Sequence, residues 1–308
     1  MNKPQPQTTP PRQNEHLLRL ATYASVSVAV MLILAKLIAW SLSDSVSLLA
    51  TLIDSILDAI ASLINLFAVR HALTPADKEH RFGHGKAEAL AGLSQSMFIA
   101  GSAGFLLLEV GRHIISPIEI QYPTISIMVM ILSIVATMLL VGFQHYVVKR
   151  TQSTAIRADA LHYKSDLLAN AGVILALWLS MQGWHQADVI IATLIAVYIL
   201  YSAWDIVRVS LDQLMDRELP DDVRKKIIEI VLQHSCAQGA HDLRTRHSGT
   251  VTFIQLHLEL EDNLSLLEAH AISDEVEDSL LQAFPGSEII IHMDPKSIVG
   301  HETVDEFH

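Results

Sequence analysis

The stretch that decides the fold is Leu48-Leu-Ala-Thr-Leu-Ile-Asp54-Ser-Ile-Leu-Asp58-Ala-Ile-Ala-Ser-Leu-Ile-Asn65-Leu-Phe67, a largely apolar run that contains two carboxylates. A charged side chain at the centre of a membrane helix costs about 2.5–3.5 kcal/mol on insertion scales, so such residues are rare there and serve a function. The spacing of four residues places Asp54 and Asp58 on one face of a helix. The stretch therefore predicts a membrane-spanning helix with a paired carboxylate site.

A second pair of polar side chains repeats this spacing much further along the chain. The sequence Leu161-His162-Tyr-Lys-Ser-Asp166-Leu has an imidazole in place of one carboxylate, again at the edge of an apolar run. If the two helices face each other, they offer three carboxylates and one imidazole. Such a set suits a tetrahedral divalent cation of the zinc type, whereas magnesium and calcium favour oxygen ligands alone.

The composition of the chain excludes several classes of protein. Of its 308 residues, 51% are hydrophobic and only 18% are charged, which is more apolar than an ordinary soluble protein. The formal net charge of -12 argues against a nucleic-acid binder. A single cysteine, Cys236, excludes an internal disulfide framework and a cysteine-rich zinc site. The 16 histidines are therefore the natural metal ligands of this chain.

The apolar residues gather in blocks long enough to cross a bilayer, which takes about 20 residues per helix. We predict six spans, at residues 17–42, 46–73, 87–115, 124–148, 160–181 and 187–211. The first residues are rich in proline, glutamine and threonine, a composition typical of disorder. The predicted domains are a disordered leader over 1–15, a six-helix transmembrane domain over 16–214, a cytosolic metal-binding domain over 215–298 and a flexible tail over 299–308.

Lysine and arginine are unequally distributed over the predicted loops. They flank the first span and gather between the second and third spans and between the fourth and fifth, whereas the other loops carry almost none apart from Arg112. By the positive-inside rule, both termini are expected to be cytoplasmic. His162 and Asp166 then lie near the cytoplasmic start of the fifth span.

The chain after Asp216 has the pattern of a small soluble α+β domain. Ser248 and Gly249 form the predicted hairpin turn, and Ser265 followed by Glu268 predicts a capping box at the second helix. The expected elements are a helix at 220–231, strands at 241–246 and 250–259, a helix at 265–284 and a strand at 288–292. This αββαβ order indicates an open two-layer domain.

The loop after the second span contains a third group of possible metal ligands, in Pro75-Ala-Asp77-Lys-Glu-His80-Arg-Phe-Gly-His84-Gly-Lys86-Ala-Glu88. Together with the two membrane pairs and the plan of six spans followed by an αββαβ domain, this loop resembles the cation diffusion facilitator family. The chain is similar to the bacterial zinc and ferrous-iron efflux branch of that family. The resemblance covers essentially everything after the leader, and the αββαβ domain is then expected to be metallochaperone-like.

The resemblance implies three metal sites and one salt bridge. It implies a transport site, in which protons and metal compete, formed by Asp54, Asp58, His162 and Asp166. It implies a loop site formed by Asp77, His80 and His84, and a binuclear cytosolic site formed by His241, His257, His270, His292 and Asp294. Asp294 is the expected bridging carboxylate. It also implies an interlocking salt bridge near the dimer contact, between Lys86 and Asp216.

The expected activity follows from the resemblance and from coordination chemistry. Carboxylate and imidazole groups bind metal only when deprotonated, so metal binding releases protons. The sequence contains no G-x-x-x-x-G-K-[ST] loop, which argues against an ATP-driven pump. We therefore expect a homodimeric metal/proton antiporter, not an enzyme, that exports Zn2+ from the cytoplasm across the bacterial inner membrane. Cd2+ and Fe2+ remain alternative cargoes, because nitrogen and oxygen ligands accept them as well.

Each group of ligands also has a simpler interpretation. The membrane carboxylates could form a buried polar patch paired with a lysine, and charge in a hydrophilic loop is usually solvated. At the level of the whole chain, one alternative is a membrane-anchored metal sensor without transport. Another is an intramembrane metalloprotease, but the sequence lacks H-E-x-x-H, and a closed site with four ligands leaves no position for an activated water.

Overall fold

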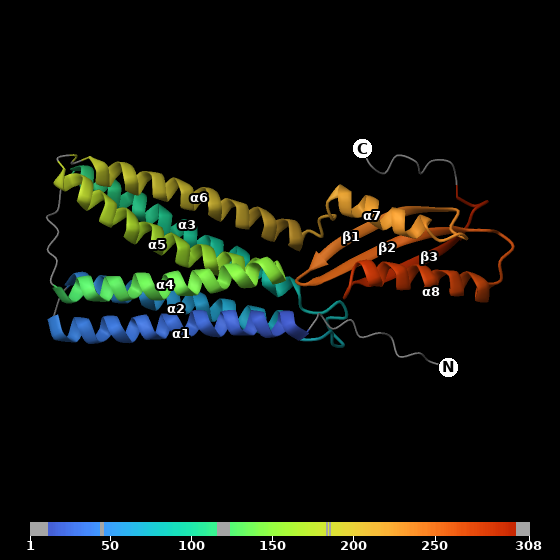
Figure 1. Cartoon of the computed structure of the whole chain (residues 1–308), viewed down its shortest axis with the longest axis horizontal. Coiled ribbons are helices and arrows are strands. Elements are labelled where there is room, and N and C mark those ends of the chain that lie inside the picture. Colours follow the sequence, from blue (N-terminus) through green and yellow to red (C-terminus); the bar gives the residue numbers. More distant parts are fainter. Residues whose placement is uncertain (1–11, 44–45, 116–123, 183, 185, 300–308) are drawn as a thin grey trace. The chain divides into compact units, whose positions relative to one another are not determined.

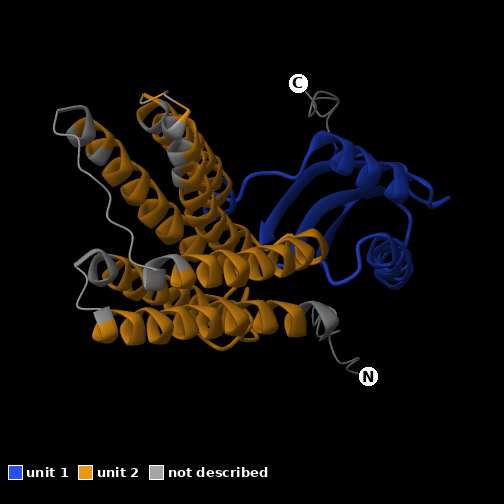
Figure 2. Ribbon diagram, turned by 60° about the vertical axis from the view of Figure 1, so that its left-hand side comes forward, with its two compact units in different colours: residues 1–12, 212–308 blue, residues 13–211 orange. Residues whose placement is uncertain are grey.

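The computed structural model describes the whole chain except residues 1–11, 44–45, 116–123, 183, 185 and 300–308. Most of the predicted leader and nearly all of the predicted tail therefore lie outside the described residues. The chain divides into two compact units (Figure 2), one made of residues 13–211 and the other of residues 1–12 and 212–308. Each unit is described by itself below.

Six long helices make up the first unit in the described part of the chain (Figure 1). They are α1 (Arg12–Ser43), α2 (Val46–Ala72), α3 (Lys86–Ile115), α4 (Thr124–Thr151), α5 (Thr154–Met181) and α6 (Ala187–Leu214). This order confirms the predicted helical membrane domain. The largest difference from the predicted spans is at α5, which begins at Thr154, before the apolar run.

Among the described residues, five helices are long and apolar enough to cross a membrane: α1, α2, α3, α4 and α6. Helix α5 has the length, at 28 residues, but its first half is too polar to meet the same criterion. The polar residues there are Arg157, Asp159, His162, Lys164 and Asp166. Among the described residues, the one long helix of the unit that fails this criterion is thus the one that carries half of the predicted transport site.

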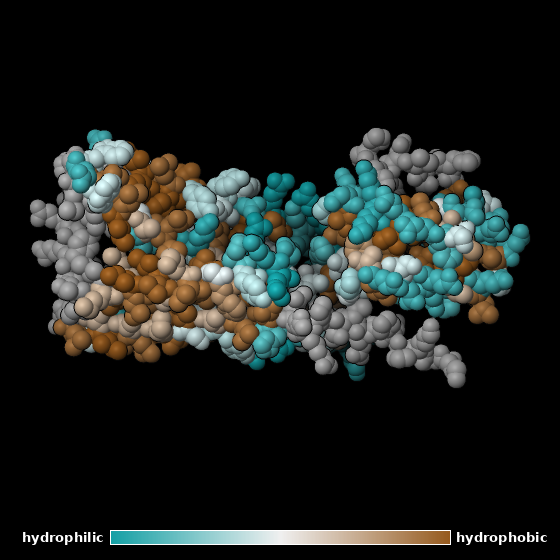
Figure 3. Space-filling view, in the orientation of Figure 1, coloured by the Kyte–Doolittle hydropathy of each residue, from teal (hydrophilic) through white to brown (hydrophobic). Residues whose placement is uncertain are grey.

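Small buried side chains allow these helices to approach closely. Leu18 and Ala21 of α1, Val69 of α2, Ala91 of α3, Val147 of α4, and Ala155 and Ile156 of α5 form one buried cluster. Ile99 and Ala103 of α3 pack with Ile199 and Ala203 of α6 in a second cluster. Small residues are favoured where membrane helices meet. Large apolar side chains cover the outside of the helices instead (Figure 3), as expected for a surface in contact with lipid.

The second unit contains the predicted αββαβ domain. Its elements are α7 (Asp221–Leu232), β1 (Gly239–Ser248), β2 (Val251–Leu260), α8 (Leu266–Ala283) and β3 (Glu288–Pro295). Within the described residues the sheet has the order β1-β2-β3, with β1 antiparallel and β3 parallel to β2. The parallel pair requires the crossover that α8 provides.

The strands of this domain have two different faces. On β2 the residues Ile254, Leu256 and Leu258 are buried and pack with Ile227 of α7 and Leu280 of α8. Because side chains alternate along a strand, the residues between them project from the opposite face. These are Phe253, Gln255, His257 and Glu259. The sheet thus presents an apolar face to the helices and a face with histidine and carboxylate side chains on the other side.

The hairpin between β1 and β2 differs from the prediction by one residue. Strand β1 extends through Ser248 and β2 begins at Val251, so the turn consists of Gly249 and Thr250. Gly249 has φ +60°, a left-handed conformation that glycine adopts without strain. Glycine is therefore in the turn as predicted, whereas the predicted first turn residue is the last residue of the strand.

The predicted capping box of α8 is confirmed. The Ser265 hydroxyl accepts a hydrogen bond from the Glu268 backbone N–H at 3.3 Å, and the Glu268 carboxylate accepts one from the Ser265 backbone N–H at 2.8 Å. The Ser265 hydroxyl also donates to this carboxylate at 2.7 Å. The hydrogen bonds from Ser265 lower the pKa of Glu268 below its ordinary value of 4.5.

We predict that Ser265→Ala loosens α8. Losing a serine N-cap costs about 1 kcal/mol of helix stability, which raises the equilibrium constant for local unfolding of the first turn about fivefold. Amide hydrogen exchange of the first turn of α8, measured by mass spectrometry on the full-length protein, should quicken by that factor at pH 7. Ser279→Ala, an exposed serine within the same helix, is the matched control and should change exchange there much less. Equal exchange in both variants would contradict the capping role.

The same hydrogen bonds predict a pH dependence of the cap. A carboxylate whose pKa is lowered by folding stabilises the folded state above its unfolded pKa, and this stabilisation is lost as the pH falls through the folded value. The contribution of Glu268 should therefore be complete above about pH 4.5 and disappear at lower pH. The exchange difference between wild type and Ser265→Ala should narrow when both are compared at acidic pH.

Candidate metal centres

Three residues of the predicted transport site lie together between α2 and α5. His162 Nε2 is 2.9 Å from Asp58 Oδ1 and 4.0 Å from Asp166 Oδ2. The ligand atoms of the three residues all lie within 4.8 Å of one another, and the imidazole is buried. A small shift of the side chains would let all three contact one ion, because zinc binds nitrogen and oxygen ligands at about 2.0–2.2 Å.

Asp54 does not join this group in the structure. It lies one helical turn before Asp58 on α2 and is exposed, outside the set of mutually close ligand atoms. Its charge interacts with those of Asp58, Lys36 and His162, so it lies within electrostatic range of the cluster. Its direct part in metal binding stays a prediction, and it requires Asp54 to turn toward His162.

Lys36 is the kind of lysine partner that the simpler interpretation of the membrane carboxylates requires, although the sequence analysis did not name the residue. From α1, its ammonium group donates to the Thr51 carbonyl at 3.0 Å and to the Ser55 hydroxyl at 2.6 Å. It also interacts electrostatically with Asp54, Asp58 and Asp166. The sequence could have indicated this residue, because a lysine inside an apolar run is as unusual as an aspartate there. Lys36 therefore belongs to the immediate surroundings of the carboxylate cluster.

A buried polar network lies one turn before His162 on α5. The carboxylate of Asp159 is fully buried and accepts hydrogen bonds from Ser25 of α1 at 2.6 Å and from Gln144 of α4 at 2.7 Å. The Tyr163 hydroxyl forms a hydrogen bond with Ser62 of α2 at 2.8 Å. These contacts connect α5 to three other helices and thereby fix the orientation of the helix turn that carries His162.

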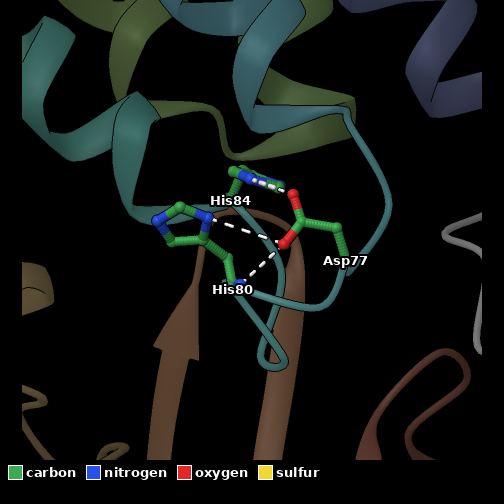
Figure 4. A group of neighbouring side chains, drawn as sticks. All are labelled: Asp77, His80 and His84. Atoms are coloured by element: carbon green, nitrogen blue, oxygen red, sulfur yellow. Dashed lines mark hydrogen bonds and ion pairs between the residues drawn. The ribbon is translucent and has the colours of Figure 1, made fainter.

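The loop between α2 and α3 brings Asp77, His80 and His84 together (Figure 4). One carboxylate oxygen of Asp77 accepts hydrogen bonds from the backbone N–H groups of His80, at 2.6 Å, and Glu79, at 2.9 Å. Its other oxygen is 3.4 Å from His84 Nε2. Mainly because of the hydrogen bond from the His80 backbone, the pKa of Asp77 is lowered, which keeps the carboxylate ionised and able to bind a cation.

The cytosolic cluster lies on the face of the sheet opposite the helices. The strand register places His257 beside His241 of β1 and beside His292 of β3. One oxygen of Asp294 is 2.7 Å from His257 Nδ1 and 3.5 Å from His241 Nε2, and the other is 3.2 Å from His292 Nε2. The carboxylate therefore contacts different histidines through its two oxygens, an arrangement that a bridging ligand between two ions requires.

His270 is not part of this cluster. It is exposed on α8, where its Nδ1 is 3.7 Å from Asp274 Oδ1. Helix α8 packs on the apolar face of the sheet, whereas Asp294 and the clustered histidines occupy the other face. The participation of His270 in a binuclear site stays a prediction, because within this one chain His270 does not contact the cluster.

Two further carboxylates belong beside the cytosolic histidines and were missed from the sequence. Glu259 Oε1 is 3.1 Å from His241 Nδ1, and Asp242 Oδ2 is 3.6 Å from His257 Nε2. Glu259 follows His257 by two residues, so strand alternation could have indicated it. Asp242 could not be found in this way, because a β-bulge after His241 with φ +47° at Asp242 brings it into the cluster.

The predicted salt bridge between Lys86 and Asp216 joins residues of different units. Lys86 is the first residue of α3, and Asp216 follows α6 with φ +57°. The Asp216 carboxylate accepts a hydrogen bond from Arg246 at 3.3 Å within its own unit. The pairing with Lys86 stays a prediction.

Comparison with known families identifies both units. Residues 22–215 match the family model described as the cation efflux transmembrane domain, and residues 219–296 match the cytoplasmic domain of cation efflux proteins. The chain belongs to the cation diffusion facilitator family. The predicted resemblance is thus confirmed, and the helical unit is a cation efflux domain of a transporter family.

Individual relatives cover nearly the whole chain. The cation-efflux pump FieF of Escherichia fergusonii is 52% identical over 286 residues, which are 93% of this chain and 95% of the relative. FieF of Escherichia coli strain K12 is 51% identical over the same shares. Among solved structures, a zinc form of the transporter CzrB is 33% identical and covers 28% of this chain and 98% of that one, with a TM-score of 0.27.

We predict that Glu259→Gln weakens zinc binding by the cytosolic domain about 10- to 100-fold. A carboxylate that accepts the second ring N–H of a ligating histidine orients that ring and raises its basicity. The measurement is competition with a chromogenic chelator, using full-length protein in which Asp58→Asn and His80→Ala disable the other two clusters. Glu261→Gln, an exposed glutamate two residues further on, should retain wild-type affinity. Equal affinities would show that Glu259 does not support the site.

Proposed function

We propose that this protein is a homodimeric metal/proton antiporter that exports divalent transition-metal cations from the cytoplasm across the bacterial inner membrane, with Zn2+ as its first cargo. The observation that carries the proposal is the cluster of Asp58, His162 and Asp166, contributed by two helices of a cation efflux domain. Carboxylates and a buried imidazole at such a position are expensive in a membrane and mark ion and proton pathways.

Proton coupling follows from the same ligands. His162 Nε2 lies 2.9 Å from Asp58 Oδ1, a distance at which a protonated Nε2 donates a hydrogen bond to the carboxylate. Metal must displace this proton, since neutral imidazole and ionised carboxylate are the ligating forms. Imidazole ordinarily titrates near neutral pH, which suits it to exchange a proton for a metal ion at the pH of a cell envelope. The pH gradient would then drive release on the far side.

The choice of metal follows from the donor set. One nitrogen and two or three carboxylate oxygens favour borderline divalent ions, of which Zn2+ prefers four-coordinate tetrahedral sites. Cd2+ and Fe2+ are the alternative cargoes, and the FieF relatives are named as cation-efflux pumps without a metal. Selectivity between these ions depends on geometry and availability as much as on affinity.

The cytosolic domain is proposed to sense metal and to hold the dimer together. It matches the family model for the cytoplasmic domain of cation efflux proteins, and the cluster around Asp294 offers several ligands on one face of its sheet. With both termini cytoplasmic, as the loop charges indicate, the domain contacts the metal pool from which cargo is taken. Metal bound there would neutralise part of the repulsion between two acidic domains.

We predict that Asp58→Asn abolishes transport. The neutral amide keeps the size of the side chain but removes the charge that binds metal. Protein reconstituted into vesicles that contain a zinc-sensitive dye should show zinc flux driven by an imposed pH gradient, and this flux should fall at least about 100-fold in the variant, to background. Flux in the variant equal to wild type would overturn the assignment of the transport site.

Two further variants separate transport from sensing. Glu261→Gln, an exposed residue outside the three clusters, is the control and should leave the flux unchanged. His257→Ala, which disables the cytosolic cluster, should reduce the flux in part and leave it dependent on the pH gradient. Zinc binding by the cytosolic domain without gradient-driven flux in wild type would favour the membrane-anchored metal sensor.

A further inference from the structure

His71 lies beside the loop cluster without belonging to any site described above. It occupies the last turn of α2 and is exposed. The centre of its ring is 4.5 Å from that of His84, with the ring planes inclined at 63°. The ring of His80 is 4.7 Å from His84, inclined at 50°. His84 therefore has two imidazole neighbours at nearly the same distance.

These ring separations match those of histidines that share one metal ion. Zinc–nitrogen bonds of about 2.0–2.1 Å and tetrahedral angles place the centres of two ligating rings about 5 Å apart. Both separations at His84 are within about half an ångström of that value. In the cytosolic cluster, His241 and His257 show the same relation, with ring centres 5.1 Å apart.

The loop cluster has one ligand fewer than a closed zinc site. Asp77, His80 and His84 provide three mutually close ligand atoms, whereas zinc sites that hold their metal permanently have four protein ligands. His71 lies outside this set of mutually close ligand atoms, so its ring must turn toward the cluster to bind the same ion. The Nδ1 of His84 lies 3.2 Å from the Thr74 carbonyl, to which its N–H donates, so Nε2 is left to bind the metal. This second-sphere hydrogen bond is typical of ligating histidines and fixes the ring beside His71.

We propose that His71 is the fourth protein ligand of the loop site, so that the site is a closed tetrahedral zinc centre. The inference rests on the predicted metal binding by the loop cluster. His71 belongs to α2, the helix that carries Asp54 and Asp58, and His84 lies two residues before the start of α3. A bound ion would thus connect the end of the transport helix to the start of the next one.

The test uses full-length protein in which Asp58→Asn and His257→Ala disable the other two clusters. Co2+ serves as the probe, because the strength of its visible absorption distinguishes four-coordinate tetrahedral sites from sites with more ligands. Zinc affinity is measured by competition with a chelator. We expect His71→Ala to replace the tetrahedral Co2+ spectrum with the weak spectrum of a more hydrated ion and to raise the zinc dissociation constant at least about tenfold.

Two variants control for folding and position. His71→Gln keeps the length and helix preference of the side chain and should cause the same spectral loss. His145→Ala removes an exposed histidine of α4 outside the clusters and should change neither measurement. A histidine in the last turn of a helix also interacts with the helix dipole. If this were its only role, His71→Ala would lower the melting temperature while the spectrum stayed tetrahedral, which would overturn the inference.

His80→Ala distinguishes failure of the inference from failure of the loop site itself. Loss of Co2+ binding in His80→Ala, with an unchanged spectrum in His71→Ala, would leave the loop site standing and reject His71 as a ligand. Unchanged Co2+ binding in both variants would reject the loop site together with its fourth ligand.

Discussion

The contact between His162 of α5 and Asp58 of α2 is the interaction on which the membrane unit depends. A hydrocarbon environment solvates neither group, so each must find its partner within the protein. This requirement explains why the polar half of α5 contacts other helices through hydrogen bonds. It also explains the network around Asp159, because a helix with so many polar groups is stable in a membrane only when their hydrogen bonds are satisfied internally.

Much of the fold could be predicted because length and periodicity determine it locally. Six long apolar runs predicted six helices, and alternation along residues 250–259 predicted β2 with its two faces. Local patterns also indicated the capping box at Ser265. Helix α5 begins six residues before the predicted span, because hydropathy does not register helical turns that are polar. The hairpin shifted by one residue because either glycine-containing pair could form the turn.

The membership of each candidate site was harder to predict, since it depends on contacts between distant segments. The spacing of four residues predicts the same role for Asp54 and Asp58. In the structure, only Asp58 lies in the cluster with His162. Likewise, counting histidines cannot show that α8 carries His270 on the other side of the sheet from Asp294. Asp242 reaches the cytosolic cluster through a bulge, and Lys36 comes from a helix that carries no other charge near it in the sequence. Such residues become visible only when the helices and strands are assembled.

The register between β2 and β3 has a consequence for how this protein can evolve. It pairs His257 with His292 and Glu259 with Asp294, while Leu258 and Met293, which lie between them, pack in the core on the side of the helices. A slip of one residue in a strand exchanges its two faces completely. Deleting or inserting a single residue within β3 would therefore replace metal ligands with isoleucine and push charged groups into the core. The metal ligands and the core residues of β3 therefore depend on the same register, which a substitution at these positions preserves and a slip of the strand destroys.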